Sequence, residues 1–267
     1  MPMIDLAPAH EFLLELLPRA GEVLKGYFLS GNFTSTGKKG LDFKTQADDA
    51  VDVLLRQNIS AKYPDIPILS EETASDDYFL LKNSEYLWVI DPLDGTTNFS
   101  RGNPRFAISV ALVARGLPKL GVIHLPVSGD IYYVQAGSGP ALLNGKKIGV
   151  SSTKKLREAV LACDWSWDTE KRLELVRWLG SLAGCVRQIK SMGCAVADLA
   201  SLARGEIDAY LHSGLKPWDV AAAALLIQEA GGKVTTSTGG AWDVFQPDLL
   251  AANSVLHNII CEVLNNG

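Results

Sequence analysis

The order of predicted strands and helices changes near Val150, and this change restricts the fold class more than any other feature of the chain. Apolar strand segments with tight connections precede it, at residues 66–70, 86–91, 106–114, 121–125 and 131–135. After it, strand segments alternate with helical segments, at 160–163, 168–183, 186–189, 194–203, 207–211, 218–230, 249–252 and 255–265. We therefore predict an α+β half over residues 1–150, with an antiparallel sheet, and a mixed α/β half over residues 151–267.

Two helices and a loop are predicted before the first strand. Apolar residues at helical spacing indicate a helix over residues 10–30, which Pro18 should kink or split. The polar, Gly-rich segment 31–40 is expected to be a mobile loop. Thr45 can then cap a second helix, with Asp48 supplying negative charge in its first turn.

The composition excludes several classes of function. Of the 267 residues, 47% are hydrophobic, enough for a large core, and the net charge of −5 does not suit a surface built to bind nucleic acid or an anionic membrane. No apolar run approaches the ~20 residues of a membrane span, and Met1–His10 does not resemble a secretory signal. We expect a cytoplasmic protein with no nucleic-acid or membrane partner. The cysteines lack the spacing of a zinc site and are expected to be reduced: Cys163, Cys185, Cys194 and Cys261.

The segment WVIDPLDGTTNF, residues 88–99, places two carboxylates in one turn. An apolar strand ends at Asp91, a turn follows, and Asp94 comes soon enough to face the same point. Converging carboxylates repel each other unless a cation lies between them, and Mg²⁺ prefers hard oxygen ligands of this kind. Gly95 and Thr96 then offer backbone N–H groups where a helical turn can begin and phosphate oxygens can bind.

Acidic residues recur at two distant points of the chain. Glu71 and Glu72 follow a short apolar strand segment, and Asp219 lies in the first turn of a predicted helix. Each feature alone has a simpler interpretation, because Asp-Pro-x-Asp-Gly is a common turn composition, Glu71-Glu72 suits a solvated loop, and an acid is favoured at any helix start. Taken together, acids at strand ends and at a helix start in both halves predict one crevice that collects a cation.

Four segments resemble the inositol monophosphatase family of magnesium-dependent phosphatases. WVIDPLDGTTNF and PWDVAAAALLIQEAGG resemble the two family signatures, SEET resembles the metal-binding Glu-Glu segment, and DFKTQAD resembles the upstream Asp-x-x-Thr-x-x-Asp segment. Their order and spacing agree over nearly the whole chain. The resemblance implies a layered αβαβα sandwich, two or three Mg²⁺ ions per active site between the halves, a homodimer, and inhibition by lithium.

The resemblance also implies a role for individual residues. Thr96 and Asp48 would orient the attacking water and help to deprotonate it, while Gly95 and Thr96 would donate backbone hydrogen bonds to the phosphate. Glu72 would support the metal ligands without binding the ion itself. The implied metal ligands are Glu71, Asp91, Asp94 and Asp219, with Leu93 contributing its backbone carbonyl group.

The positions implied to bind substrate depart from the family pattern. Gly193, Cys194 and Ala195 stand where relatives often have Gly-Ser/Thr-Ala at a helix start. Cys194 can still offer its backbone N–H, or can simply pack there as a small residue. His212 stands where several relatives that hydrolyse inositol phosphates have an acid. A histidine can bind a hydroxyl, bind a second phosphate if protonated, or be structural.

These observations predict a Mg²⁺-dependent phosphomonoesterase acting on a small sugar or polyol phosphate similar to inositol 1-phosphate. Lys38 and Lys39 in the early loop either close over the phosphate or face solvent. A fructose-1,6-bisphosphatase is one alternative, suggested by Leu-Lys-Pro at 215–217. A 3′(2′),5′-bisphosphate nucleotidase is another, although Thr97-Asn98 argues against it. The non-enzymatic alternative is a protein of the same fold that binds a metal or a macromolecular partner.

Overall fold

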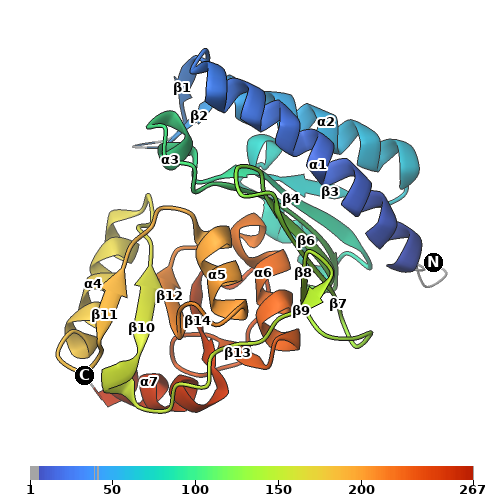
Figure 1. Cartoon of the computed structure of the whole chain (residues 1–267). Coiled ribbons are helices and arrows are strands. Elements are labelled where there is room, and N and C mark those ends of the chain that lie inside the picture. Colours follow the sequence, from blue (N-terminus) through green and yellow to red (C-terminus); the bar gives the residue numbers. More distant parts are fainter. Residues whose placement is uncertain (1–5, 39, 41, 267) are drawn as a thin grey trace.

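Helices and sheets alternate in layers, with helices outermost on each side and further helices between the two sheets (Figure 1). The structure, a computed structural model, describes residues 6–38, 40 and 42–266. Residues 1–5 of the N-terminal segment considered above, and Lys39 of the two candidate phosphate lysines, lie outside this part of the chain. The layers form the αβαβα sandwich that the sequence predicts.

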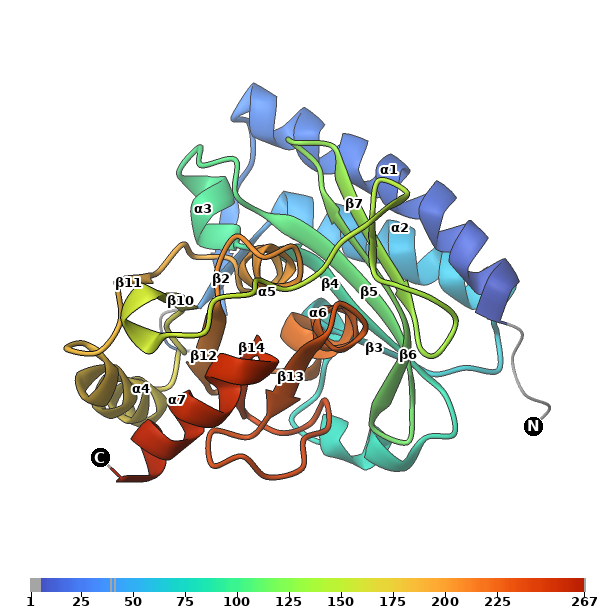
Figure 2. The same cartoon turned by 60° about the horizontal axis from the view of Figure 1, so that its bottom comes forward.

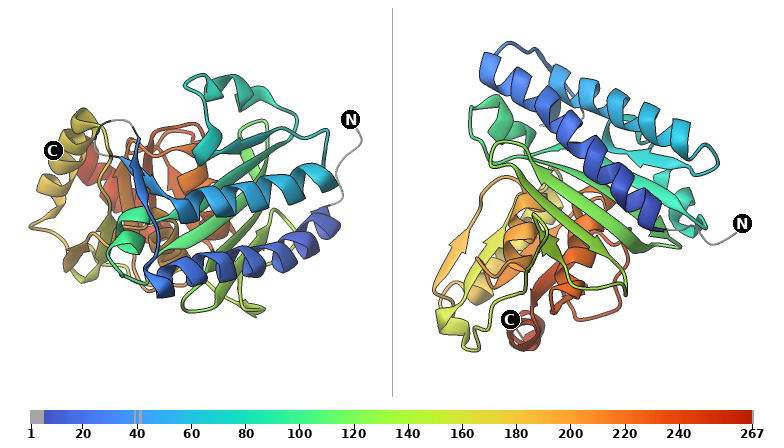
Figure 3. Two further views of the ribbon diagram at one scale, coloured as in Figure 1. Left: turned by 90° about the horizontal axis from the view of Figure 1, so that it is seen from above. Right: turned by 45° about the vertical axis from the view of Figure 1, so that its right-hand side comes forward.

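The first half is a seven-stranded sheet with one face covered by α1 (Leu6–Ser30) and α2 (Gln46–Lys62), which lie side by side across it (Figure 3). The strands neighbour one another in chain order, and the pairs are antiparallel except for β3 with β4, which is parallel. They are β3 (Ile68–Ser70), β4 (Leu87–Asp94), β5 (Ala107–Ala114), β6 (Leu117–Leu125), β7 (Asp130–Gln135), β8 (Leu142–Leu143) and β9 (Lys146–Lys147).

The apolar run in β4 is explained by the layers on both sides of it. Trp88 and Ile90 pack with α1 and α2, whereas Leu87 and Val89 belong to the core between the two sheets. Successive strand side chains point to opposite faces, so a strand covered on both faces must be apolar at every position. The first acid of β4, Asp91, is therefore conspicuous in the sequence.

The second half is a five-stranded sheet in the order β11-β10-β12-β14-β13. Helices α5 (Ala195–Ala203) and α6 (Pro217–Glu229) lie between the two sheets, while α4 (Thr169–Leu182) and α7 (Ser254–Asn266) cover the outer face (Figure 2). Strands β10, β11 and β12 are parallel, so their carboxyl ends share one edge. The strands are β10 (Val160–Cys163), β11 (Gln188–Lys190), β12 (Ala209–Ser213), β13 (Gly232–Thr235) and β14 (Asp248–Asn253).

Helix α6 joins the two halves. All residues from Val220 to Ile227 are buried, because the helix contacts both sheets. It comes very close to β6 at Gly121, where a Cβ atom would lie only 2.9 Å from Cα of Ala222. The close approach requires glycine on the strand and a small residue on the helix, and it places the start of α6, with Asp219, beside the first half.

Two local predictions need correction, and strand β13 was missed. Of the two effects expected of Pro18, a kink or a split, the split does not occur, since α1 runs unbroken from Leu6 to Ser30. Burial of Leu13, Leu16 and Leu17 at ~1.5–3 kcal/mol each outweighs the ~3 kcal/mol that an internal proline costs. The predicted loop 31–40 contains strand β1 (Ser35–Gly37), paired with β2 (Phe43–Thr45). Strand β13 was not predicted, and it forms by pairing with β14.

Short helical turns complete the described part of the chain. They are α3 (Thr96–Ser100) and the 3₁₀ turns η1 (Glu71–Thr73), η2 (Tyr78–Asn83) and η3 (Leu156–Glu158). Among the described residues, no helix combines the length and apolar character that a membrane crossing demands.

Candidate active site

The end of strand β4 is bent by a bulge. The pairing of β4 with β5 shifts register between Asp91 and Asp94, where Pro92 has no N–H to contribute to the ladder. Asp91 is buried, and its Oδ1 accepts a hydrogen bond of 3.0 Å from the backbone N of Leu93. Gly95 follows with φ of +89°, a conformation that favours glycine, and α3 begins after it. The bulge and this turn hold Asp91, Leu93 and Asp94 within one short stretch of backbone.

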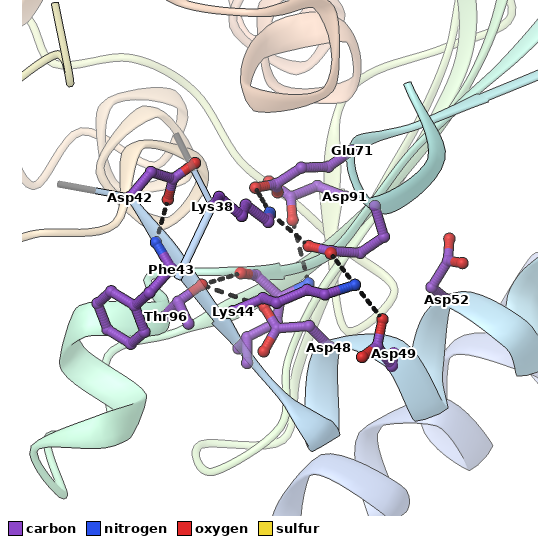
Figure 4. Close-up of polar contacts among 12 residues, drawn as sticks. Lys38, Asp42, Phe43, Lys44, Asp48, Asp49, Asp52, Glu71, Asp91 and Thr96 are labelled. Carbon is purple, nitrogen blue, oxygen red and sulfur yellow. Dashed lines mark hydrogen bonds and ion pairs between the residues drawn. The ribbon is translucent and has the colours of Figure 1, made fainter. Parts of the chain in front are cut away.

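Thr96 and Asp48 lie together, as the resemblance implies (Figure 4). Thr96 Oγ1 is 3.2 Å from Asp48 Oδ1 and 3.1 Å from the carbonyl oxygen of Leu93. Asp48 itself is fixed by the capping box of α2, because its Oδ2 accepts hydrogen bonds from the backbone N and Oγ1 of Thr45 at 2.7 and 2.6 Å. Burial raises the pKa of Asp48 to about 6, against the lowering effect of the Thr45 hydrogen bonds.

Lys38 bridges the two acids of η1. Its Nζ lies 2.8 Å from Glu71 Oε1 (Figure 4). The same Nζ lies 2.7 Å from Glu72 Oε1, and Lys44 Nζ lies 3.3 Å from Glu72 Oε2. Burial works to lower the pKa of Lys38, but the two carboxylates raise it above its ordinary value. Lys38 therefore neither faces solvent freely nor stands apart from the acids; it is a counter-ion within the cluster.

Asp94 and Asp219 are each held by a helix start. Asp94 Oδ2 accepts hydrogen bonds from Cys194 Sγ at 2.9 Å and from the backbone N of Val196 at 2.6 Å. Asp219 Oδ2 accepts one of 2.7 Å from the backbone N of Lys216, which closes the first turn of α6. The two acids come from different halves of the chain, and each is oriented by a backbone N–H group at the start of a helix.

The four acids form one electrostatic cluster. Burial is the main cause that raises the pKa of Glu71 to about 8, those of Asp94 and Asp219 to about 7, and that of Asp91 well above its usual range, and repulsion from neighbouring acids adds to it. Lys38 opposes this effect at Glu71. Raised pKa values at all four carboxyls mean that the cluster has too little positive charge nearby to balance four ionised groups. The carboxyl oxygens are the hard ligands that Mg²⁺ prefers.

The donor set therefore fits a divalent cation, although its members are engaged elsewhere. Within residues 6–38, 40 and 42–266, no three acidic, histidine or cysteine side chains are placed so that they enclose an ion as they stand. Lys38 engages Glu71, and Cys194 with Val196 engages Asp94. Metal ligation by Glu71, Asp91, Leu93, Asp94 and Asp219 stays a prediction.

The predicted substrate-binding residues fall into two groups. Gly95 and the segment 193–195 meet, since a Cβ on Gly95 would lie 3.1 Å from Cys194 Cβ and 3.3 Å from the carbonyl oxygen of Gly193. Cys194 donates its thiol to Asp94, so its side chain positions a candidate metal ligand. His212 is buried on β12, its Nδ1 has no hydrogen-bond partner, and burial lowers its pKa to about 4. A neutral His212 argues against the second-phosphate interpretation.

Two acids beside the site were missed in the sequence. Asp164 follows β10 and accepts a hydrogen bond of 2.8 Å from the backbone N of Gly193, while Asp198 lies in the first turn of α5 and is fully buried. A signal for Asp164 existed, because it ends an apolar strand just as Asp91 does. Asp198 carried no such signal, since an acid in the first turn of a helix is common.

The chain is similar to known proteins over nearly its whole length. An inositol monophosphatase of Dictyostelium discoideum is 33% identical over 260 residues, covering 94% of this chain and 95% of that protein. A fructose-1,6-bisphosphatase/inositol-1-monophosphatase of Thermotoga maritima is 32% identical over 258 residues, covering 96% and 95%. The solved structure of extragenic suppressor protein suhB from Bartonella henselae is similar with a TM-score of 0.89 at 29% identity, covering 98% of this chain and 100% of that one. A model described as the inositol monophosphatase family matches residues 5–267, and this chain belongs to that family of phosphatases.

Proposed function

We propose that this protein is a Mg²⁺-dependent phosphomonoesterase that hydrolyses a small sugar or polyol phosphate by metal-activated water. The observation that carries the proposal is the cluster of four mutually repelling carboxyls, drawn from both halves, beside the Thr96–Asp48 pair. Glu71, Asp91, Asp94 and Asp219 would hold two or three Mg²⁺ ions. Bound Mg²⁺ supplies charge neutralisation and lowers the pKa of water, which are the main requirements of phosphoryl transfer.

The Thr96–Asp48 pair supplies the proton transfer. Thr96 Oγ1 accepts a proton from the attacking water while its own proton passes to Asp48 Oδ1, with which it is hydrogen bonded. A pKa of about 6 leaves Asp48 mainly ionised at pH 7 yet basic enough to accept this proton. The water oxygen forms a bond to phosphorus, the ester bond breaks, and the alcohol oxygen leaves with a proton from solvent. Backbone N–H groups of Gly95 and Thr96, at the start of α3, would bind the phosphate.

The proposed class of substrate is supported by the state of His212. A buried, neutral His212 suits a hydrogen bond to a hydroxyl group better than the binding of a second phosphate. This favours a monophosphate of a polyol over fructose 1,6-bisphosphate or a bisphosphate nucleotide. The name of the Thermotoga maritima relative, which includes both activities, keeps the fructose bisphosphate alternative open to test.

Phosphate release with and without Mg²⁺ tests the proposal. Asp94→Asn should lower turnover by about a hundred-fold or more while the fold is kept, because an amide oxygen can still accept from Cys194 and Val196 but carries no charge for the metal. The matched control is Asp65→Asn, at an exposed turn, which should leave turnover unchanged. Metal-independent release, or full activity of Asp94→Asn, would overturn the assignment.

A substrate panel then separates the alternatives. Inositol 1-phosphate should be hydrolysed with a higher kcat/KM than fructose 1,6-bisphosphate or 3′-phosphoadenosine 5′-phosphate. Absence of release from every compound by folded, Mg²⁺-loaded protein would favour the non-enzymatic alternative. The homodimer implied by the resemblance and the cytoplasmic location expected from the sequence stay predictions.

A further inference from the structure

A second pair of buried acids lies behind the segment that holds Asp94. Asp164 follows strand β10 and is 8% exposed, and Asp198 in the first turn of α5 is 0% exposed. The two carboxyls come within hydrogen-bonding reach of each other. Neither belongs to the proposed metal ligands or to the Thr96–Asp48 pair.

One oxygen of each carboxyl is fully engaged. Asp164 Oδ1 accepts from the backbone N of Gly193 at 2.8 Å and from Ser191 Oγ at 3.2 Å. Asp198 Oδ1 accepts from Arg105 Nε at 2.9 Å and from Arg105 Nη2. The Oδ2 atom of each is buried and receives no N–H or O–H donor from any other described residue. Two carboxyls can be hydrogen bonded to each other only if one of them carries a proton, and such a bond would give a partner to buried oxygens that otherwise have none.

The charges nearby agree with one shared proton. Two ionised carboxylates in contact repel each other, and Arg105 is the cation that contacts the pair, through Asp198. Burial and the charge of Asp164 raise the pKa of Asp198 to about 8, against the attraction of Arg105. With one proton on the pair, one negative charge faces one guanidinium group, and the buried charges balance.

The pair is linked to the proposed active site through the segment 191–196. The backbone N–H of Gly193 donates a hydrogen bond to Asp164. The thiol of Cys194, the residue after Gly193, donates to Asp94, and the backbone N–H of Val196 donates to the same Asp94 oxygen. On the other side of the segment, Asn98 Nδ2 donates to the carbonyl oxygen of Met192 at 2.8 Å. The segment is therefore held between Asn98 and Asp164, and its position determines where Asp94 points.

We propose that Asp164 and Asp198 share one proton, and that the pair is a positioning device that fixes the 191–196 segment and, through it, Asp94. This inference rests on the proposed function only in taking Asp94 as a Mg²⁺ ligand. It assigns to Asp164 and Asp198 a role in metal affinity although neither binds the metal.

Asparagine substitutions give a sharp test, because the side chain of asparagine resembles a protonated carboxyl: one atom accepts hydrogen bonds, the other donates them, and the group carries no charge. In Asp164→Asn, Oδ1 still accepts from Gly193 and Nδ2 donates to Asp198; in Asp198→Asn, Oδ1 still accepts from Arg105 and Nδ2 donates to Asp164. Each single variant should keep kcat and the Mg²⁺ concentration for half-maximal activity within about threefold of the wild type. The double variant brings two NH₂ groups together and leaves Arg105 without an anion, so its loss should greatly exceed the sum of the single losses.

Asp164→Ala removes the acceptor of Gly193 altogether. The substitution should raise the Mg²⁺ concentration needed for half-maximal activity by about tenfold or more, because a group that helps to orient a metal ligand is lost. Amide hydrogen exchange of Gly193 gives a readout independent of activity: protection should be kept in Asp164→Asn and lost in Asp164→Ala. If the double variant does not fold, the comparison of Asp164→Asn with Asp164→Ala still tests the proposal.

Two results would overturn the inference. One is an Asp164→Ala protein that is folded and has unchanged Mg²⁺ dependence and unchanged Gly193 protection. The other is a double asparagine variant that behaves as the sum of the singles. If the wild type releases no phosphate at all, the proposed function fails, whereas the exchange pattern of Gly193 still decides whether the carboxyl pair holds the segment.

Discussion

At the scale of single residues, His212 illustrates how burial decides chemistry. It lies on the central strand β12 with 4% of its surface exposed, and its ring stacks near that of Tyr210, with centroids 6.3 Å apart. Its sequence position allowed a charged or a neutral role. Only its burial, which lowers its pKa to about 4, selects the neutral one at pH 7.

The titration of His212 makes acid destabilise the fold. The folded-state pKa of about 4 lies below the unfolded value of 6.5, so the unfolded chain binds the proton first as pH falls. The contribution is fully present above pH 6.5 and is lost between pH 6.5 and pH 4, by roughly 3 kcal/mol in total. His212→Gln removes the titrating group. The difference in free energy of unfolding between wild type and variant, measured by denaturant titration, should therefore change over this pH range; two parallel pH curves would contradict the prediction.

At the scale of elements, the contact of α6 with β6 matters most, because it carries Asp219 to the first half. Gly121 allows this contact, and the nearest atom to an added Cβ is backbone, the Cα of Ala222 at 2.9 Å. Backbone cannot move aside as a flexible side chain can. Any larger residue at position 121 must displace α6 from the sheet.

Gly121→Ala should therefore destabilise the protein by about 1–3 kcal/mol, the range typical of overpacking in a tight core. Gly26→Ala is the matched control, because Gly26 lies within α1 and an added Cβ meets nothing within 4 Å. There the same substitution should stabilise by up to about 1 kcal/mol, since alanine suits a helix interior better than glycine. Thermal unfolding of the two variants should shift in opposite directions, and a shift of equal sign would contradict the packing argument.

Elements with a strong period were predictable, and short ones were not. Helix α2 and strands β4 and β10 follow from apolar pattern and capping residues that act locally. Strand β13, only four residues long, exists because β14 offers it a partner, and β1 exists because β2 does. Pairing between segments distant in the chain is decided by tertiary structure, which local preference does not report.

At the scale of the whole molecule, the proposed metal site lies where the two halves meet, so metal binding should stabilise their association. At a Mg²⁺ concentration about 100 times the Kd, the gain in free energy of unfolding is about 2.7 kcal/mol. Chelation of Mg²⁺ should therefore lower the Tm of the wild type. A Tm that does not respond to Mg²⁺ would count against a metal site in the folded protein.

Asp219→Asn should raise the Tm in the absence of Mg²⁺ and lower it in the presence of Mg²⁺. Without metal, it removes one carboxylate from a mutually repelling cluster, so its Tm should exceed that of the wild type. With Mg²⁺, it lacks the ligand that the second half provides, so its Tm should fall below that of the wild type. Differential scanning fluorimetry with Mg²⁺ and with chelator measures both, and the Asp65→Asn control should show neither effect.

The sequence by itself determined the family, the layered fold and the candidate acids, because those depend on apolar periodicity and on short motifs in which neighbouring residues act together. Tertiary structure alone decided which distant groups meet. Thr96 forms a hydrogen bond with Asp48, 48 positions away in the chain, and Cys194 forms one with Asp94, 100 positions away. It also decided that Lys38 lies among the acids, that His212 is neutral, and that Asp164 faces Asp198. The physical reason is that hydrogen-bond partners and pKa values depend on burial and on spatial neighbours, which exist only once the layers have packed.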